Sequence, residues 1–157
     1  MRLYFVRHGI AEDGNGIDDF QRKLTKEGVE QMRTCAKVMA KLKIKPVRIY
    51  SSPRVRARQT ADIIGEALGV QVEAREEVGY EFSTEAVASL INGLPDDAEV
   101  MFVGHEPSFS ETVGTLVGGG KVMMKKGGLA RVDVFSREPL RGVLIWLIAP
   151  RVFGTLA

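Results

Sequence analysis

Cysteine and histidine are scarce in this chain of 157 residues, which has one cysteine and two histidines. A single cysteine excludes an internal disulfide framework and suits a reducing cytoplasm. So few Cys and His side chains argue against a zinc cluster, and we expect neither a metal nor a cofactor. Long hydrophobic runs are also missing. The longest, residues 143–149, has the length of a strand, whereas a membrane span needs about 18 residues.

An excess of charge of one sign is missing as well. The chain has 22 Lys and Arg against 20 Asp and Glu, a net charge of +2. That balance predicts neither a nucleic-acid partner nor a membrane surface. The start of the chain carries charge too early for a secretory signal. We therefore expect one cytoplasmic domain over residues 1–157, whose oligomeric state the sequence does not indicate.

Short apolar runs alternate with segments of helical periodicity, which predicts an α/β fold. We expect strands at residues 3–6, 47–50, 70–74, 100–103, 129–135 and 143–148, and helices at 25–42, 53–68, 84–91 and 108–118. Residues 10–24 are polar and are expected to form a loop. The last two strands follow each other through a turn at Glu138-Pro139. The prediction is a three-layer α/β/α arrangement around a mostly parallel sheet with an antiparallel edge.

Side chains are expected to cap three of these helices. Thr25 is a plausible N-cap for the first helix, and Ser52 followed by Pro53 is typical of the start of the second. Ser108 and Glu111 have the spacing of a capping box at the start of the last.

Both histidines of the chain follow predicted strands. Arg7-His8-Gly9 comes after the first strand and Gly104-His105 after the fourth, while Ser51-Ser52 follows the second. In open α/β sheets, ligands bind beyond the carboxyl ends of the strands. An arginine offers a fork of donors for an oxyanion, and a histidine can serve as nucleophile or proton carrier. Taken singly, each histidine is better explained as a hydrogen-bonded residue at a loop or strand end.

The second helix carries three arginines that its periodicity separates. Its buried stripe is predicted to be Ala57, Ala61, Ile64 and Leu68. Arg54 and Arg58 fall on a different face with Asp62, and we expect that face to be solvated. Arg56 lies beside the buried stripe in the first turn, near free backbone N–H groups. Arg56 is therefore the arginine expected to reach an anion.

Four runs in order along residues 1–117 resemble motifs of the histidine phosphatase superfamily, which has the phosphoglycerate-mutase-like fold. Within it they are most similar to the short SixA-type phosphohistidine phosphatases. The runs are Phe5–Gly9 (Phe-Val-Arg-His-Gly), Arg22–Gly28 (Arg-Lys-Leu-Thr-Lys-Glu-Gly), Ser51–Ala61 (Ser-Ser-Pro-x-x-Arg-Ala-x-Gln-Thr-Ala) and Val103–Ser110 (Val-Gly-His-Glu-Pro-Ser-Phe-Ser).

The resemblance implies a phosphatase in which His8 takes the phosphoryl group. Arg7, Arg56 and His105 would surround the phosphate, and Arg22 would contact the phosphate or the incoming partner. Such a set of donors stabilises the charge of a transferring phosphoryl group without a metal. The implied substrate is a phosphohistidine of a protein. Two alternatives stay open, a phosphatase for small phosphate esters and an inactive phosphate-binding adaptor.

The sequence departs from the family at the carboxylic acid that protonates the leaving group in many members. Glu73, Glu76, Glu77 and Glu81 lie in the corresponding region, but the surrounding motif of the larger mutases is missing. A phosphohistidine substrate fits this gap, since imidazole has a pKa of about 6.5 and leaves more easily than an alkoxide.

Overall fold

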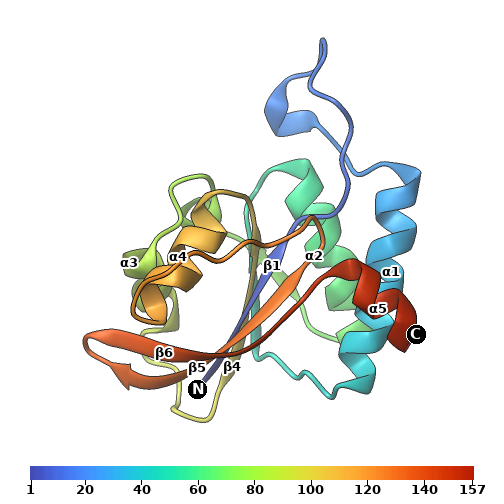
Figure 1. Cartoon of the computed structure of the whole chain (residues 1–157). Coiled ribbons are helices and arrows are strands. Elements are labelled where there is room, and N and C mark those ends of the chain that lie inside the picture. Colours follow the sequence, from blue (N-terminus) through green and yellow to red (C-terminus); the bar gives the residue numbers. More distant parts are fainter.

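Six strands form one sheet through the middle of the molecule in the computed structural model, which describes residues 1–157 (Figure 1). The strands are β1 (Arg2–Arg7), β2 (Arg48–Ser51), β3 (Val72–Ala74), β4 (Glu99–Gly104), β5 (Leu129–Arg137) and β6 (Leu140–Ile148). Their order in the sheet is β3-β2-β4-β1-β5-β6. The first four run parallel, whereas β5 pairs antiparallel with both β1 and β6. The predicted parallel sheet with an antiparallel edge is confirmed.

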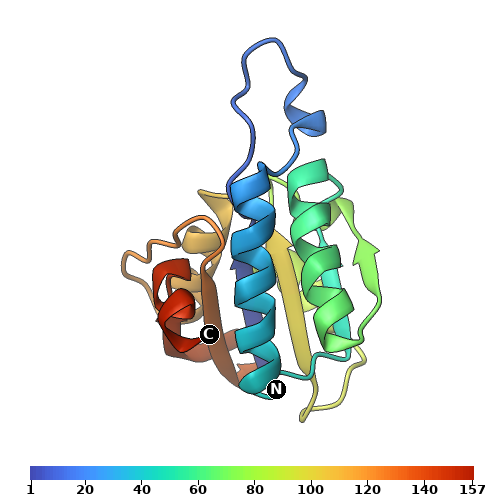
Figure 2. The same cartoon turned by 90° about the vertical axis from the view of Figure 1, so that its right-hand side faces the viewer.

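Helices cover both faces of this sheet. They are α1 (Lys26–Lys41), α2 (Val55–Leu68), α3 (Thr84–Ile91), α4 (Ser108–Leu116) and α5 (Pro150–Leu156). Figure 2 shows α1 and α2 side by side over one face, with α5 next to α1. On β1, Tyr4 and Val6 pack toward these helices, while Leu3 and Phe5 pack into the other core under α3 and α4. The three predicted layers are therefore present. None of the helices is long and apolar enough to cross a membrane.

The phase of α2 agrees with the prediction from its sequence. Ala57, Ala61 and Ile64 are completely buried. The helix ends at Gly69, whose φ of 70° places it in the left-handed region that glycine adopts most readily. The amide of Val70 then bonds back to the helix, so β3 begins at Val72, two residues later than expected.

The predicted caps are confirmed in one case and wrong in two. Thr25 accepts a hydrogen bond from the Gly28 amide at the start of α1. The capping residue of α2 is Arg54, and the Ser52 hydroxyl accepts from the Arg54 amide ahead of the helix.

The Ser108–Glu111 capping box of α4 is not formed either. The Ser108 hydroxyl donates to the carbonyl of His105 instead. The carboxylate of Glu106, from just before the helix, accepts the Ser110 amide at 2.9 Å.

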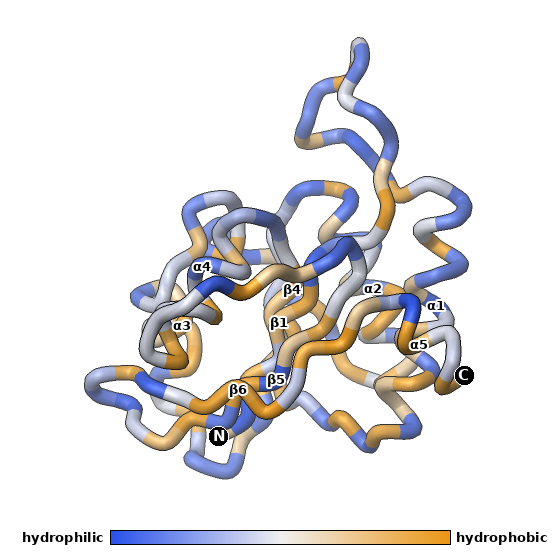
Figure 3. The backbone as a smooth tube through the Cα atoms, viewed as in Figure 1, coloured by the Kyte–Doolittle hydropathy of each residue, from blue (hydrophilic) through white to orange (hydrophobic).

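Residues 10–24, called the finger below, project from the end of the sheet (Figure 1). The finger is mostly hydrophilic (Figure 3) and largely irregular, as predicted. It is closed at its base by a bridge between Ala11 and Leu24, and it contains a short 3-10 turn at Asp19–Gln21. Gly28 packs against the base so closely that a Cβ would overlap the carbonyl of Ile10. The Arg22–Gly28 motif therefore fixes where the finger leaves the body.

Candidate active site

The carboxyl ends of three adjacent parallel strands bring the predicted site residues together. β1 and β2 flank β4, with Arg7 paired to Gly104 and Ser51 paired to Val103. The next residues stay in register, because the His8 amide donates to the Gly104 carbonyl at 2.9 Å and the Ser52 amide to Val103 at 3.0 Å. His8, Ser52 and His105 thus leave neighbouring strands at one edge of the sheet.

His8 is held in one tautomer. Its Nδ1 lies 2.7 Å from the carbonyl of Gly9, which can only accept, so Nδ1 carries the proton. Nε2 therefore carries the one lone pair of the ring, and with it accepts a hydrogen bond from Nε of Arg56 at 3.3 Å. Burial, together with the positive charges of Arg56 and Arg7, lowers the pKa of His8 to about 4. The ring is therefore neutral at pH 7, with Nε2 as a potential nucleophile.

Arg56 reaches the site from the first turn of α2, as its helical phase predicts. It is 3% exposed. Besides the bond to His8, its Nη1 donates to the carbonyl of Asp19 at 2.8 Å and its Nη2 to the hydroxyl of Tyr80 at 2.6 Å. Thr60, one turn along α2, accepts from the Gly9 amide and donates to the Arg56 carbonyl. One helix thus positions both the guanidinium and the loop that carries His8.

His105 and Arg7 complete the set, and each has a buried nitrogen without a partner. The two histidine rings lie 5.3 Å apart between centroids. Nε2 of His105 is hydrogen-bonded to the Ser52 hydroxyl at 2.7 Å, while its Nδ1 is buried without a partner. Arg7 donates from Nη1 to the carbonyl of Met124, and its Nε is also buried without a partner. Burying a polar atom unpaired costs roughly 1–3 kcal/mol, so Nε of Arg7 is suited to an anionic ligand, and so is Nδ1 of His105 in the tautomer that has its proton there.

The surroundings also keep His105 neutral. Burial and the nearby charge of Arg56 lower the pKa of His105 to about 3. A neutral His105 has one N–H and one lone pair on its ring. Which nitrogen carries the proton depends on the orientation of the Ser52 hydroxyl.

Arg22 lies at the rim of this set. Its Nε donates to the carbonyl of Glu12 at 2.8 Å, and its Nη1 is 3.1 Å from Oδ1 of Asp19. Arg22 therefore belongs to the finger, and its contact with the site runs through Asp19.

The structure corrects the prediction for Arg54. This residue caps α2 and does not continue the solvated face; Arg58 and Asp62 do form the exposed pair expected there, at 2.9 Å. The Arg54 guanidinium lies over the ring of Tyr80, 3.9 Å from its centroid, and pairs with Asp19 at 3.4 Å. Helical periodicity did not apply to Arg54, because the helix begins one residue after it.

Two residues of the site have no counterpart in the sequence prediction. Tyr80 connects Arg56 to the finger through its hydroxyl, which donates to Asp19 at 2.5 Å, and its ring is 4.9 Å from that of His105. Asp19 lies in a polar loop without periodicity. The only local signal was the 3-residue spacing between Asp19 and Arg22, which also fits a solvated pair.

The four candidate glutamates do not join the site. Glu73 and Glu77 both pair with Arg75, at 3.3 and 2.7 Å, and this group lies on the surface. Glu76 and Glu81 are exposed, and neither is hydrogen-bonded to a histidine or arginine of the site. Asp19 is the carboxylate that contacts Arg56.

Comparisons with known proteins agree with this geometry. The model of the histidine phosphatase superfamily (branch 1) matches residues 3–79. An uncharacterized protein of Picosynechococcus sp. is 32% identical over 136 residues, covering 82% of each chain. The phosphohistidine phosphatase SixA of Escherichia coli K12 is 26% identical over 155 residues, covering 96% of this chain and 94% of SixA.

A solved structure of the protein histidine phosphatase SixA, complexed with tungstate, has a TM-score of 0.86 to this chain. The two are 25% identical, and the match covers 97% of this chain and 99% of the other.

Proposed function

The chain belongs to the histidine phosphatase superfamily and is of the SixA type, and from this premise we propose that it removes phosphoryl groups from phosphohistidine on a protein. The reaction would proceed through a covalent phosphohistidine at His8. In this proposal the protein acts in the cytoplasm, in signalling, and as a single domain.

The observation that carries the proposal is the state of His8. A neutral ring with its proton fixed on Nδ1 has its lone pair at Nε2, which accepts from Nε of Arg56, and the ring of the second histidine lies 5.3 Å away between centroids. A binding protein needs no such nucleophile, so the geometry favours an enzyme over an adaptor.

The chemistry follows from the same contacts. Nε2 of His8 forms a bond to phosphorus while the bond from phosphorus to the substrate breaks, and water then cleaves phospho-His8 to release phosphate. Charge on the transferring oxygens is stabilised by Arg7, Arg56 and His105: Nε of Arg7 and Nδ1 of His105 are buried without partners, and Arg56 donates to His8 itself. We propose that these residues suffice without a metal, and that Arg22 assists from the rim.

The leaving group supports the assignment of substrate class. An imidazole leaves without strong acid assistance, because its reference pKa is about 6.5. An alkoxide needs a proton donor, and none of Glu73, Glu76, Glu77 or Glu81 contacts the site. A protein-borne phosphohistidine is therefore favoured over a small phosphate ester.

Trapping the intermediate tests the catalytic part. A protein carrying ³²P-labelled phosphohistidine is mixed with enzyme and quenched in alkali, in which phosphohistidine survives. We expect an acid-labile label on the wild type and on Arg58→Ala, a control at an exposed surface position. His8→Ala should carry no label and turn over more slowly by about 10⁴-fold or more. If His8→Ala turns over substrate like the wild type, the mechanism is wrong.

Substrate preference tests the second part of the proposal, that the substrate is phosphohistidine on a protein. The wild type should hydrolyse the phosphohistidine protein with a much higher kcat/KM than sugar phosphates. The opposite preference would assign a small-molecule phosphatase. Binding of phosphate without turnover of either substrate would assign an adaptor.

A further inference from the structure

The carboxylate of Asp19 stands among the cationic groups of the candidate anion site. Its Oδ1 is 3.1 Å from Nη1 of Arg22 and 3.5 Å from Nη2 of Arg56. Its Oδ2 accepts from the Tyr80 hydroxyl at 2.5 Å and lies 3.4 Å from Nε of Arg54. Four groups from the finger, α2 and the segment before α3 thus converge on one carboxylate beside the guanidinium that also contacts the nucleophile.

This placement depends on the site and not on apolar packing of the finger. No residue of the 3-10 turn at Asp19–Gln21 is buried. The other polar contacts of the finger, such as the Glu12–Lys23 backbone bond and the Leu24 amide with Gln59, lie at its base. Asp19 is 46% exposed in its side chain, so it remains accessible to a group that enters the site.

The charge of Asp19 sets what it can do for a substrate. The hydrogen bond from Tyr80, together with Arg22, Arg56 and Arg54, holds the pKa of Asp19 far below its usual value. Asp19 is therefore ionised throughout the pH range of the reaction, and it accepts hydrogen bonds without donating one. A carboxylate in that state cannot protonate an alkoxide leaving group.

A negative charge next to Arg56 is unfavourable for every phosphate that binds there. Like charges close together at a partly buried site repel measurably, so Asp19 weakens the binding of any phosphate. A substrate can offset this cost if its leaving group brings an N–H or a positive charge to the carboxylate. Phosphohistidine has such a group, because the ring nitrogen that does not bear phosphorus can carry a proton. Sugar and aryl phosphates do not.

We propose that Asp19 is a specificity-determining residue that accepts a hydrogen bond from the distal ring N–H of phosphohistidine and so selects this substrate over phosphate esters. The inference rests on the proposed function and deepens it. In the step, Nε2 of His8 bonds to phosphorus, and the electrons of the breaking P–N bond return to the substrate ring. That ring enters as an N–H imidazolium and departs as neutral imidazole, its proton still on the nitrogen next to Asp19. No proton has to reach the departing nitrogen.

Asp19→Asn tests this role, with Asp18→Asn as the matched control. Asp18 is exposed, makes no side-chain hydrogen bond, and loses the same charge one residue away. The substrates are a peptide phosphorylated on histidine and 4-nitrophenyl phosphate, whose leaving group needs no proton. Asp19→Asn should lower kcat/KM for the peptide by about 10-fold or more, the scale of a hydrogen bond to a charged group. It should maintain or raise kcat/KM for 4-nitrophenyl phosphate and tighten inhibition by inorganic phosphate.

The pH dependence of kcat is a readout that would not change if Asp19 had only a structural role. An anion beside the substrate ring raises the pKa of the bound imidazolium, so kcat of the wild type on the peptide should fall only above the pKa of the free phosphohistidine ring. In Asp19→Asn that fall should move to lower pH. The wild-type profile tests the inference by itself, even if Asp19→Asn fails to fold.

The outcomes separate the inference from the function that it assumes. A wild type that does not hydrolyse the phosphohistidine peptide refutes the proposed function, and the inference with it. A wild type that hydrolyses the peptide, with Asp19→Asn changing both substrates equally, refutes the inference alone. A wild-type kcat that falls at or below the pKa of the free ring also refutes it.

Discussion

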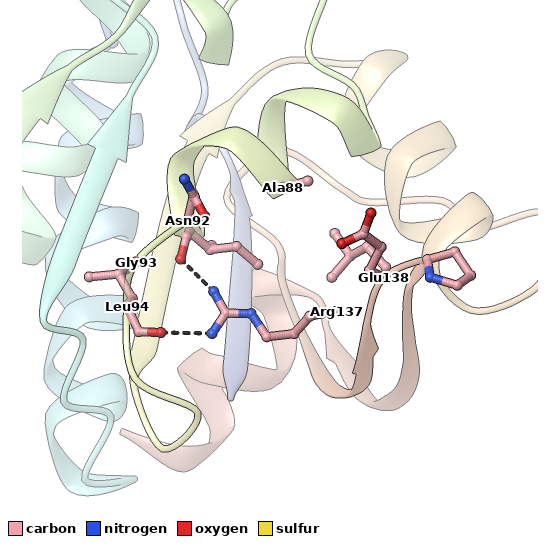
Figure 4. Close-up of a pocket in the computed structure, with 9 residues that line it drawn as sticks. Ala88, Asn92, Gly93, Leu94, Arg137 and Glu138 are labelled. Atoms are coloured by element: carbon pink, nitrogen blue, oxygen red, sulfur yellow. Dashed lines mark hydrogen bonds between the residues drawn. The ribbon is translucent and has the colours of Figure 1, made fainter.

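The two ends of the sheet each hold arginines, but they use them differently. At the carboxyl ends of β1, β2 and β4, Arg56 bonds to groups that a ligand can displace, and Arg7 keeps a buried Nε unpaired. At the opposite end, Arg137 of β5 donates to the carbonyl of Ile91 at 2.6 Å and to that of Leu94 at 2.7 Å (Figure 4). Arg137 also reaches Asp96 at 3.2 Å.

Cavity size does not distinguish a functional end from a structural one. The hollow beside Arg137 measures about 600 Å³ and is lined by the end of α3 and the Glu138-Pro139 turn. The Arg137 guanidinium is already paired with backbone carbonyls, so it connects the end of α3 to the β5–β6 hairpin. The candidate anion site is marked instead by buried nitrogens without partners and by neutral histidines.

Among the arginine substitutions, Arg56→Ala should lower kcat/KM the most. It removes a donor to the transferring phosphoryl group and the contact to Nε2 of His8, so kcat/KM should fall by about 10²-fold or more. Arg58→Ala is the control on the same helix, exposed and paired only with Asp62, and should stay within about twofold. Steady-state kinetics on the phosphohistidine protein measure both. A larger loss of kcat/KM in Arg58→Ala than in Arg56→Ala would show that the assignment of the α2 faces is wrong.

As the pH falls, the two histidines of the candidate site should be the first groups to lower the free energy of unfolding. His8 and His105 have folded-state pKa values of about 4 and about 3, below the unfolded value near 6.5. The unfolded chain therefore binds more protons as the pH falls below 6.5, and the folded protein loses stability down to about pH 3, with His8 contributing down to about pH 4. For the coupled pair we expect a loss on the order of 3 kcal/mol. Asp19 contributes only at lower pH, because its carboxylate stays ionised until then.

Urea unfolding at a series of pH values measures this loss, and His105→Asn provides the comparison. The readout is the slope of the unfolding free energy against pH, since the variant also loses its bond to Ser52. The slope between pH 6.5 and pH 4 should be shallower in the variant. An unchanged slope would place the proton uptake elsewhere in the molecule.

Local patterns carried most of the site prediction. His8 and His105 were singled out because each follows a buried strand, and Arg56 because the 3.6-residue period of α2 separates it from Arg58, while their roles came from the resemblance to the family motifs. These signals depend on a few neighbouring residues, and the observed strand order brings them together. The same reasoning predicted the three layers of the fold, since buried strands and amphipathic helices alternate along the chain.

Other parts of the site depend on contacts that no local pattern encodes. Asp19 and Tyr80 are 61 residues apart and meet only because the 3-10 turn of the finger lies beside α2. Arg54 was misassigned because a helical period says nothing about the residue that caps the helix. The cap of α4 was misassigned because the Glu106 carboxylate, and not the Ser108 side chain, accepts the Ser110 amide.

Arg137→Ala should have a smaller effect, on stability and not on catalysis. The side chain is 33% exposed, so part of each hydrogen bond is replaced by water on removal. Losing charge-assisted bonds to two carbonyls at the end of α3 should lower the unfolding free energy by about 1–2 kcal/mol. For a chain of this size that is a decrease in melting temperature of about 2–8 °C. Arg151→Ala, at an exposed position without a side-chain partner, should leave it unchanged.

The activity of Arg137→Ala decides whether Arg137 only stabilises the fold or also belongs to a second functional site. Arg137 and His8 lie at opposite ends of the sheet, so kcat/KM should stay at the wild-type value below the melting temperature. A large loss of activity in a stably folded Arg137→Ala would mean that the 600 Å³ hollow contributes to substrate binding. Because both of its nearest acceptors are backbone carbonyls, a side-chain substitution at Ile91 or Leu94 leaves these acceptors in place. A loss of stability without a loss of activity is expected of an arginine that stabilises a helix end. Arg56→Ala should show the reverse, with its larger effect on activity.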